Sequence, residues 1–123
     1  SLPIRDIRIS DLDLTLTGEA DGRFAAGMPY PLYCWASASP SPHGIFVRHG
    51  RGIRLHDTQV RWDRASGPWQ SAVRAEFVEN LDLDSLVASQ APGSTAAAVH
   101  VSDIHGLSLR HCNVGLPQCD NVT

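Results

Sequence analysis

The sequence predicts an all-β fold, and specifically a right-handed parallel β-helix of about four short coils with one long inserted loop. Three observations carry this prediction: an internal repeat, runs that alternate apolar and polar residues, and a Gly or Asn at the same place in each repeat. In a β-helix the inward residues of successive coils stack on one another, and the outward residues form rows on the surface. With 123 residues, 42% of them hydrophobic, the chain has room for a single domain, residues 1–123.

Three copies of a first alternating run set the repeat. They occupy residues 45–48, 73–76 and 99–102, which begin 28 and then 26 residues apart. A second alternating run begins eight residues after the start of each first run, at residues 53–55, 81–83 and 107–109. A turn-forming residue precedes each second run: Gly52, Asn80 and Gly106. Because Gly and Asn tolerate positive φ, these positions fit turns between strands, and the three copies predict strands stacked in register.

The remaining segments are placed by the same repeat. Residues 7–14 match the second run together with the residues after it, so the chain is expected to begin in the middle of a repeat. Residues 18–43 form an insertion rich in small residues and Pro, which we expect to emerge as a loop. Residues 112–123 are expected to form a C-terminal tail or a lid over the last coil.

Two other folds fit the pattern less well. The best helical candidate, Ser71 to Asn80, spans only ten residues, and period-two alternation recurs along the chain in place of a 3.6-residue period. A small β-sandwich would also alternate, but it gives no reason for repeats in register. The repeat therefore favours stacked parallel coils.

Several segments resemble the C-terminal coils of a known family. They are Tyr30-Pro31, Pro42–His49, Gly52–Leu55, Ala72-Val73 and Asn80–Leu83. These stretches are similar to glycoside hydrolase family 28, the polygalacturonase and rhamnogalacturonase group of pectin-degrading β-helix enzymes. The resemblance implies a parallel β-helix, a polysaccharide substrate rich in uronic acid, and a parent family that is usually secreted or periplasmic.

The catalytic motifs of that family, Asn-Thr-Asp, Asp-Asp, Gly-His and Arg-Ile-Lys, do not occur in this sequence. Phe46-Val47-Arg48 occupies the strand position similar to Arg-Ile-Lys, and Arg8-Ile9-Ser10 lacks the final Lys. We therefore expect a carbohydrate-active fragment or a degenerate relative of such a glycosidase. The alternative is a non-catalytic module that binds polysaccharide or assembles with other chains.

Outward residues of the first run form the main candidate site. Two rows are expected, with Phe46, Arg74 and His100 in one and Arg48, Glu76 and Ser102 in the other. Glycoside hydrolysis needs two carboxyl groups, and these rows supply one, so Glu76 is the catalytic candidate. Arg can hold a sugar carboxylate through two hydrogen bonds, and Phe46 offers a flat apolar surface. The competing interpretation is an ion pair between Arg48 and Glu76 on a solvated surface.

Two tryptophans complete the substrate-binding candidates. Trp62 and Trp69 flank a loop that contains Gly67 and Pro68. The pair fits either a platform on which a sugar stacks or an aromatic cap on the loop. The sequence leaves this choice open.

The remaining polar motifs predict no metal and no cofactor. Asp82 and Asp84 share one side of a strand, as catalytic or calcium-binding carboxylates do, but the alternation requires outward polar residues there in any case. The three cysteines allow at most one internal disulfide and show no metal-ligand spacing; they are Cys34, Cys112 and Cys119.

Composition limits the partners. The net charge is −3, with the arginines set among acidic residues, so nucleic acid is not expected as a partner. No apolar run approaches the roughly 20 residues of a membrane helix, and residues 1–6 do not resemble a signal peptide. The expected partners are a polysaccharide and a second copy of the chain. A first coil without a predecessor predicts a homodimer through this end, unless residues 18–43 cover it; the apolar residues concerned are Ile7, Ile9, Leu12 and Leu14.

Overall fold

The computed structural model describes residues 4–19 and 43–123, and within them the chain is all-β with no helix. The strands are β1 (Ile4–Ser10), β2 (Asp13–Glu19), β3 (Ile45–Ser66), β4 (Val73–Ala88), β5 (Val99–Arg110) and β6 (Gln118–Val122). The all-β prediction is confirmed, and no helix long and apolar enough to cross a membrane is found in the described residues. Most of the predicted insertion, including Cys34, lies outside them.

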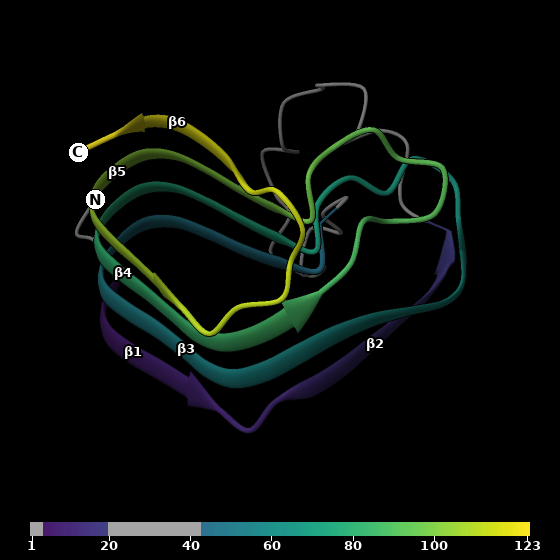
Figure 1. The fold of residues 1–123 in the computed structure, drawn as a ribbon, viewed down its shortest axis with the longest axis horizontal. Coiled ribbons are helices and arrows are strands. Elements are labelled where there is room, and N and C mark those ends of the chain that lie inside the picture. Colours follow the sequence, from purple (N-terminus) through teal and green to yellow (C-terminus); the bar gives the residue numbers. More distant parts are fainter. Residues whose placement is uncertain (1–3, 20–42) are drawn as a thin grey trace, which may run out of the picture.

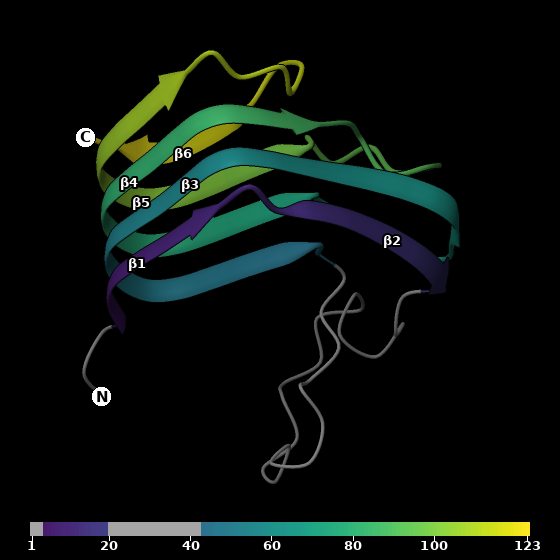
Figure 2. The same ribbon diagram turned by 90° about the horizontal axis from the view of Figure 1, so that it is seen from below.

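The strands form one parallel sheet with the order β1-β3-β4-β5-β6, and β2 also pairs with β3. Figures 1 and 2 show them as nested ribbons that bend at corresponding places. The register follows the repeat, since Ile53 pairs with Leu81 and Leu81 with Leu107, while Ile7 pairs with Ile53. The predicted alignment of the copies is therefore confirmed.

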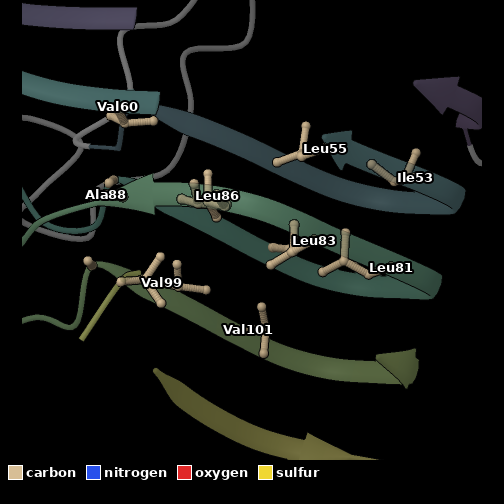
Figure 3. Packing of buried hydrophobic residues seen from close by; sticks show 14 of the residues in the cluster. Ile53, Leu55, Val60, Leu81, Leu83, Leu86, Ala88, Val99 and Val101 are labelled. Atoms are coloured by element: carbon tan, nitrogen blue, oxygen red, sulfur yellow. The ribbon is translucent and has the colours of Figure 1, made fainter. Parts of the chain in front are cut away.

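Alternation places most apolar residues of the central strands β3, β4 and β5 inside the stack. In β4 the side chains of Val73, Ala75, Leu81, Leu83 and Leu86 are buried, and the polar residues between them are more exposed. Figure 3 shows such residues of β3, β4 and β5 gathered in one cluster. Burying a Leu or Val side chain contributes about 1.5–3 kcal/mol, so this cluster is the main source of stability.

The strands bend where residues adopt the left-handed conformation, and these residues stack in three rows. The first corner consists of His49, Phe77, Asp103 and Asn121; the second of Asp6, Gly52, Asn80 and Gly106; the third of Asp11, Asp57, Ser85 and His111. Their φ angles lie between +50° and +86°. The sequence predicts positive φ for the second corner alone, at Gly52, Asn80 and Gly106, and this prediction is confirmed.

Along the second corner, each glycine lies next to a residue that carries a side chain, in the order Asp6, Gly52, Asn80 and Gly106. A Cβ atom on Gly106 would lie 2.7 Å from Oδ1 of Asn80, and one on Gly52 would lie 3.0 Å from Oδ1 of Asp6. The two glycines therefore give space to the side chains of the neighbouring strands, besides accepting positive φ.

The C-terminal segment, for which the sequence predicts a tail or lid over residues 112–123, adds a strand to the sheet. Residues 118–122 form β6, which pairs in parallel with β5. Leu116, in the connection between β5 and β6, is 90% exposed. Cys112 and Cys119 are free thiols, and Cys112 donates its S–H to backbone carbonyl oxygens of Leu83 and Arg110.

At the other edge of the sheet, Ile9 and Leu16 pack against the core cluster. Ile7 is 39% exposed. The homodimer through this edge stays a prediction.

The second corner gives a stability test. We expect Gly106→Ala to lower the free energy of unfolding by about 2 kcal/mol, roughly half from positive φ and half from displacing the Asn80 side chain. Gly93→Ala, where φ is +75° and the added Cβ meets nothing within 4 Å, should cost only the φ component, about 1 kcal/mol. Urea unfolding measures both variants. Gly106→Ala is also measured in an Asn80→Ala background. If it lowers the free energy of unfolding by the same amount there as with Asn80 present, the proposed contact is contradicted.

Candidate functional site

The candidate rows lie on one surface, which we call the outer face. It consists of the outward residues of the first run in β3, β4 and β5 and their partners in β6. One row holds Phe46, Arg74, His100 and Gln118, and the other holds Arg48, Glu76, Ser102 and Asp120. Neighbouring members of a row lie about 4.8 Å apart along the stack. Both predicted rows are present in the structure, and β6 extends each by one residue.

Glu76 lies between two guanidinium groups. Its Oε1 lies 3.3 Å from Nε of Arg48, and its Oε2 accepts a hydrogen bond of 3.1 Å from Nη2 of Arg74. Arg74 is further fixed by donating Nη1–H to the carbonyl oxygen of Ala75 at 2.9 Å. The ion pair considered as the competing interpretation therefore exists. A carboxylate engaged in this way accepts hydrogen bonds, whereas a general acid must donate a proton.

The two arginines differ in what they can offer to a ligand. The Arg74 side chain is only 15% exposed, and its contacts are directed to the protein. The Arg48 side chain is 47% exposed and uses Nε toward Glu76. A guanidinium has five N–H donors, so the terminal nitrogens of Arg48 are charged donors that a ligand can reach.

Asp120 supplies a second carboxylate that sequence analysis missed. Its Oδ2 lies 2.8 Å from Nε2 of His100 and 3.1 Å from Nε2 of Gln118. The hydrogen bond from His100 is the main cause that lowers the pKa of Asp120 below its usual value. In the row, Asp120 stands two strands from Glu76, a separation of about 10 Å. The offset from Ser102 to Asp120 is shorter than the 26–28-residue repeat, so the search for copies did not find it.

His43 lies at the edge of the outer face beside Phe46, with ring centroids 5.6 Å apart. Its Nδ1 accepts the backbone N–H of Ser71 at 3.3 Å. Burial lowers the pKa of His43 to about 4, and the charges of Arg74 and His100 act in the same direction. The imidazole is therefore neutral at physiological pH.

An aromatic platform borders the outer face at the first corner. The rings of His49 and Phe77 stack with centroids 5.2 Å apart and planes inclined by 11°. The guanidinium carbon of Arg48 lies 5.6 Å from the Phe77 ring centroid, and Phe77 is 45% exposed. Sequence analysis missed this pair because a left-handed corner interrupts the alternation, although the 28-residue offset aligns the two residues.

Trp62 and Trp69 lie in contact, and the indole N–H of each donates to a backbone carbonyl oxygen of the protein. Their rings meet edge to face with centroids 5.3 Å apart. Nε1 of Trp62 donates to the carbonyl oxygen of Ser89 at 2.8 Å, and Nε1 of Trp69 donates to that of Gly18 at 3.0 Å. These contacts are those of an aromatic cap, and stacking of a sugar on the ring faces stays a prediction.

The carboxylates of Asp82 and Asp84 contact basic side chains of the sheet. Asp82 Oδ2 lies 3.0 Å from Nε2 of His56 and 3.3 Å from Nη2 of Arg110, which also reaches Asp84 at 3.5 Å. No group of three His, Cys, Asp or Glu side chains suited to a metal ion occurs in residues 4–19 and 43–123. Asp82 and Asp84 thus form ion pairs on an outward surface.

Comparison of the chain with protein-family models, curated proteins and solved structures gives no match. A functional assignment therefore depends on the geometry described above and on the resemblance of the sequence segments.

The lowered pKa of His43 predicts that the free energy of unfolding depends on pH. Above pH 6.5 the imidazole is neutral in both the folded and unfolded chain; between pH 6.5 and about 4 only the unfolded chain binds the proton. The free energy of unfolding should therefore fall as the pH falls through this window, and His43→Gln should flatten the slope. Urea unfolding at pH 7, 5.5 and 4.5 measures it. His105→Gln, at an exposed position, is the control, and an unchanged slope in His43→Gln would contradict the assignment.

Proposed function

We propose that the protein is a right-handed parallel β-helix that binds an acidic polysaccharide along the outer face without hydrolysing it. The parallel pairing of successive repeats supports this architecture over a β-sandwich, whose sheets are antiparallel. The resemblance of the quoted segments to glycoside hydrolase family 28 supports a ligand rich in uronic acid. Loss of the family's catalytic motifs supports binding without turnover.

The observation that carries the proposal is the pairing of every carboxylate on the outer face with basic or amide groups. Glu76 contacts Arg48 and Arg74, and Asp120 contacts His100 and Gln118. Arg48 nevertheless keeps exposed donors beside the exposed Phe77 ring. A guanidinium next to a flat aromatic surface matches a sugar acid, because the carboxylate can accept from the guanidinium while the ring packs against C–H groups.

A second candidate, an inverting glycosidase, is favoured by one observation. Glu76 and Asp120 stand in the same row, with their backbones two strand spacings or about 9.6 Å apart, which is close to the upper end of the carboxyl separations of inverting enzymes. Inverting enzymes hold their two carboxyl groups about 6.5–9.5 Å apart, so that a water molecule fits beside the sugar. In this candidate Glu76 keeps the catalytic role expected from the sequence and Asp120 is its partner.

Binding and turnover separate the two candidates. We expect calorimetric titration with a galacturonic acid oligomer to show binding that Arg48→Gln weakens about tenfold, the effect of losing one charge-assisted contact. Arg61→Gln is the matched control, because Arg61, like Arg48, is an exposed arginine that forms an ion pair with a carboxylate, in this case that of Asp13. Thermal unfolding of each variant verifies the fold.

No reducing ends should appear when the full chain is incubated with polygalacturonate or rhamnogalacturonan. Turnover that Glu76→Gln and Asp120→Asn abolish would establish the glycosidase and overturn the non-catalytic proposal. Equal weakening of binding by Arg48→Gln and Arg61→Gln would show that the outer face has no special part in it.

A further inference from the structure

A second charged surface lies at the second corner of the strands, away from the rows of the outer face. We call it the arginine corner and define it by Asp6, Arg8, Arg51, Arg54 and Asn80. Arg8 of β1 and Arg54 of β3 are paired residues of adjacent parallel strands. Arg51 precedes the corner residue Gly52, and Asp6 occupies the corner in β1. Segments on either side of the long insertion thus contribute to one surface.

Two hollows meet at this corner. The smaller has a volume of about 170 Å³ and is lined by Asp6, Ile7, Arg8, Gly52 and Arg54. The larger, of about 650 Å³, shares Asp6, Gly52 and Arg54 with it and extends over Arg51, Asn80, Asp82 and Ser108. Binding sites for small molecules typically have volumes of about 300–1,000 Å³, so the larger hollow is of suitable size.

Arg8 and Arg54 of the arginine corner have no ion-pair partner within the described part of the chain. They are directly paired on adjacent strands, whose backbones lie about 4.8 Å apart, and like charges directly opposite one another destabilise a sheet. Nε of Arg8 donates only to the hydroxyl of Ser10, at 3.2 Å. Within residues 4–19 and 43–123, the Arg54 side chain makes no hydrogen bond or ion pair.

The acid next to Arg54 in the sheet contacts other basic side chains through one oxygen, and its Oδ1 is buried without a hydrogen-bond partner among the described residues. Asp82 pairs with Arg54 in register, but its Oδ2 contacts His56 and Arg110. On the other side of the corner, Arg51 lies 2.9 Å from the carboxylate of Glu79. Arg8 and Arg54 are therefore the two cations of the smaller hollow available to a ligand carboxylate.

The hollows also contain groups that would receive sugar hydroxyls. Asp6 borders both hollows as a hydrogen-bond acceptor, and Asn80 and Ser108 offer amide and hydroxyl groups in the larger one. Sulfate and chloride have no hydroxyl groups to donate to Asp6. An acidic sugar has both a carboxylate and hydroxyls, which matches two guanidinium groups beside a carboxylate.

We propose that the arginine corner binds one acidic sugar unit, whose carboxylate contacts Arg8 and Arg54 and whose hydroxyl groups contact Asp6 and Asn80. This site is separate from the outer face. The choice of a sugar acid as ligand rests on the proposed function, whereas the preference for an anion follows from the paired arginines.

The test uses the full chain and a galacturonic acid trimer. Backbone amide signals of Gly52 and Gly106, which line the larger hollow, report binding at the corner by nuclear magnetic resonance titration. We expect saturable shifts of these signals, an affinity about tenfold lower in Arg54→Gln, and no change in Arg64→Gln. Arg64 is the matched control because it is an exposed arginine outside both hollows.

Titrations with other ligands and variants give results that would contradict or support the proposal. Equal shifts with inorganic sulfate, with the methyl ester of the trimer, or with a short DNA oligonucleotide would overturn it, as would equal losses in Arg54→Gln and Arg64→Gln. Loss of trimer binding in Arg48→Gln alone would overturn the corner site and leave the outer face intact. Loss in Arg54→Gln alone, with Arg48→Gln unaffected, would support the corner and remove the outer face.

Discussion

The fold depends on left-handed residues that recur at the same places in successive strands. The corners stand three and then five residues apart in β3, β4 and β5, as at Phe77, Asn80 and Ser85. Each such residue other than glycine costs about 1–2 kcal/mol. The cost is offset because a corner out of step would break the parallel pairing on both sides and turn the apolar residues outward. Corner spacing and core burial therefore impose one register.

In-register stacking also decides the chemistry of each surface. Residues in a row lie about 4.8 Å apart, so the sequence of charges along a row determines whether the row is neutral. In the outer face, Arg48 is followed by Glu76, and the two form an ion pair. At the second corner, Arg8 is followed by Arg54, and like charges adjoin. The same architecture thus gives one row in which neighbouring charges form an ion pair and one in which two arginines adjoin.

Much of this arrangement could be predicted from the sequence because the repeat length fixes the partners. The rows containing Glu76 and His100 follow directly from offsets of 28 and 26 residues. Asp120 could not be found in this way, since the chain reaches β6 after a shorter connection. The pairing of Arg8 with Arg54 follows from the match of residues 7–14 to the second run, but only the structure shows that Asp82, the acid next to Arg54, contacts His56 and Arg110.

The first corner carries an aromatic platform, and the second corner borders a hollow. Phe77 and His49 are themselves first-corner residues, and Gly52 and Asn80 of the second corner line the larger hollow. A nearly flat strand surface presents side chains in parallel and encloses little, whereas a left-handed residue turns the backbone and brings side chains from its two sides toward one another. Arg48 and Arg51 illustrate this relation. They are three residues apart, on either side of the first corner, and one contacts the aromatic platform while the other lines the hollow. The conformational constraint that keeps the strands in register therefore also creates the surfaces on which a ligand can be held.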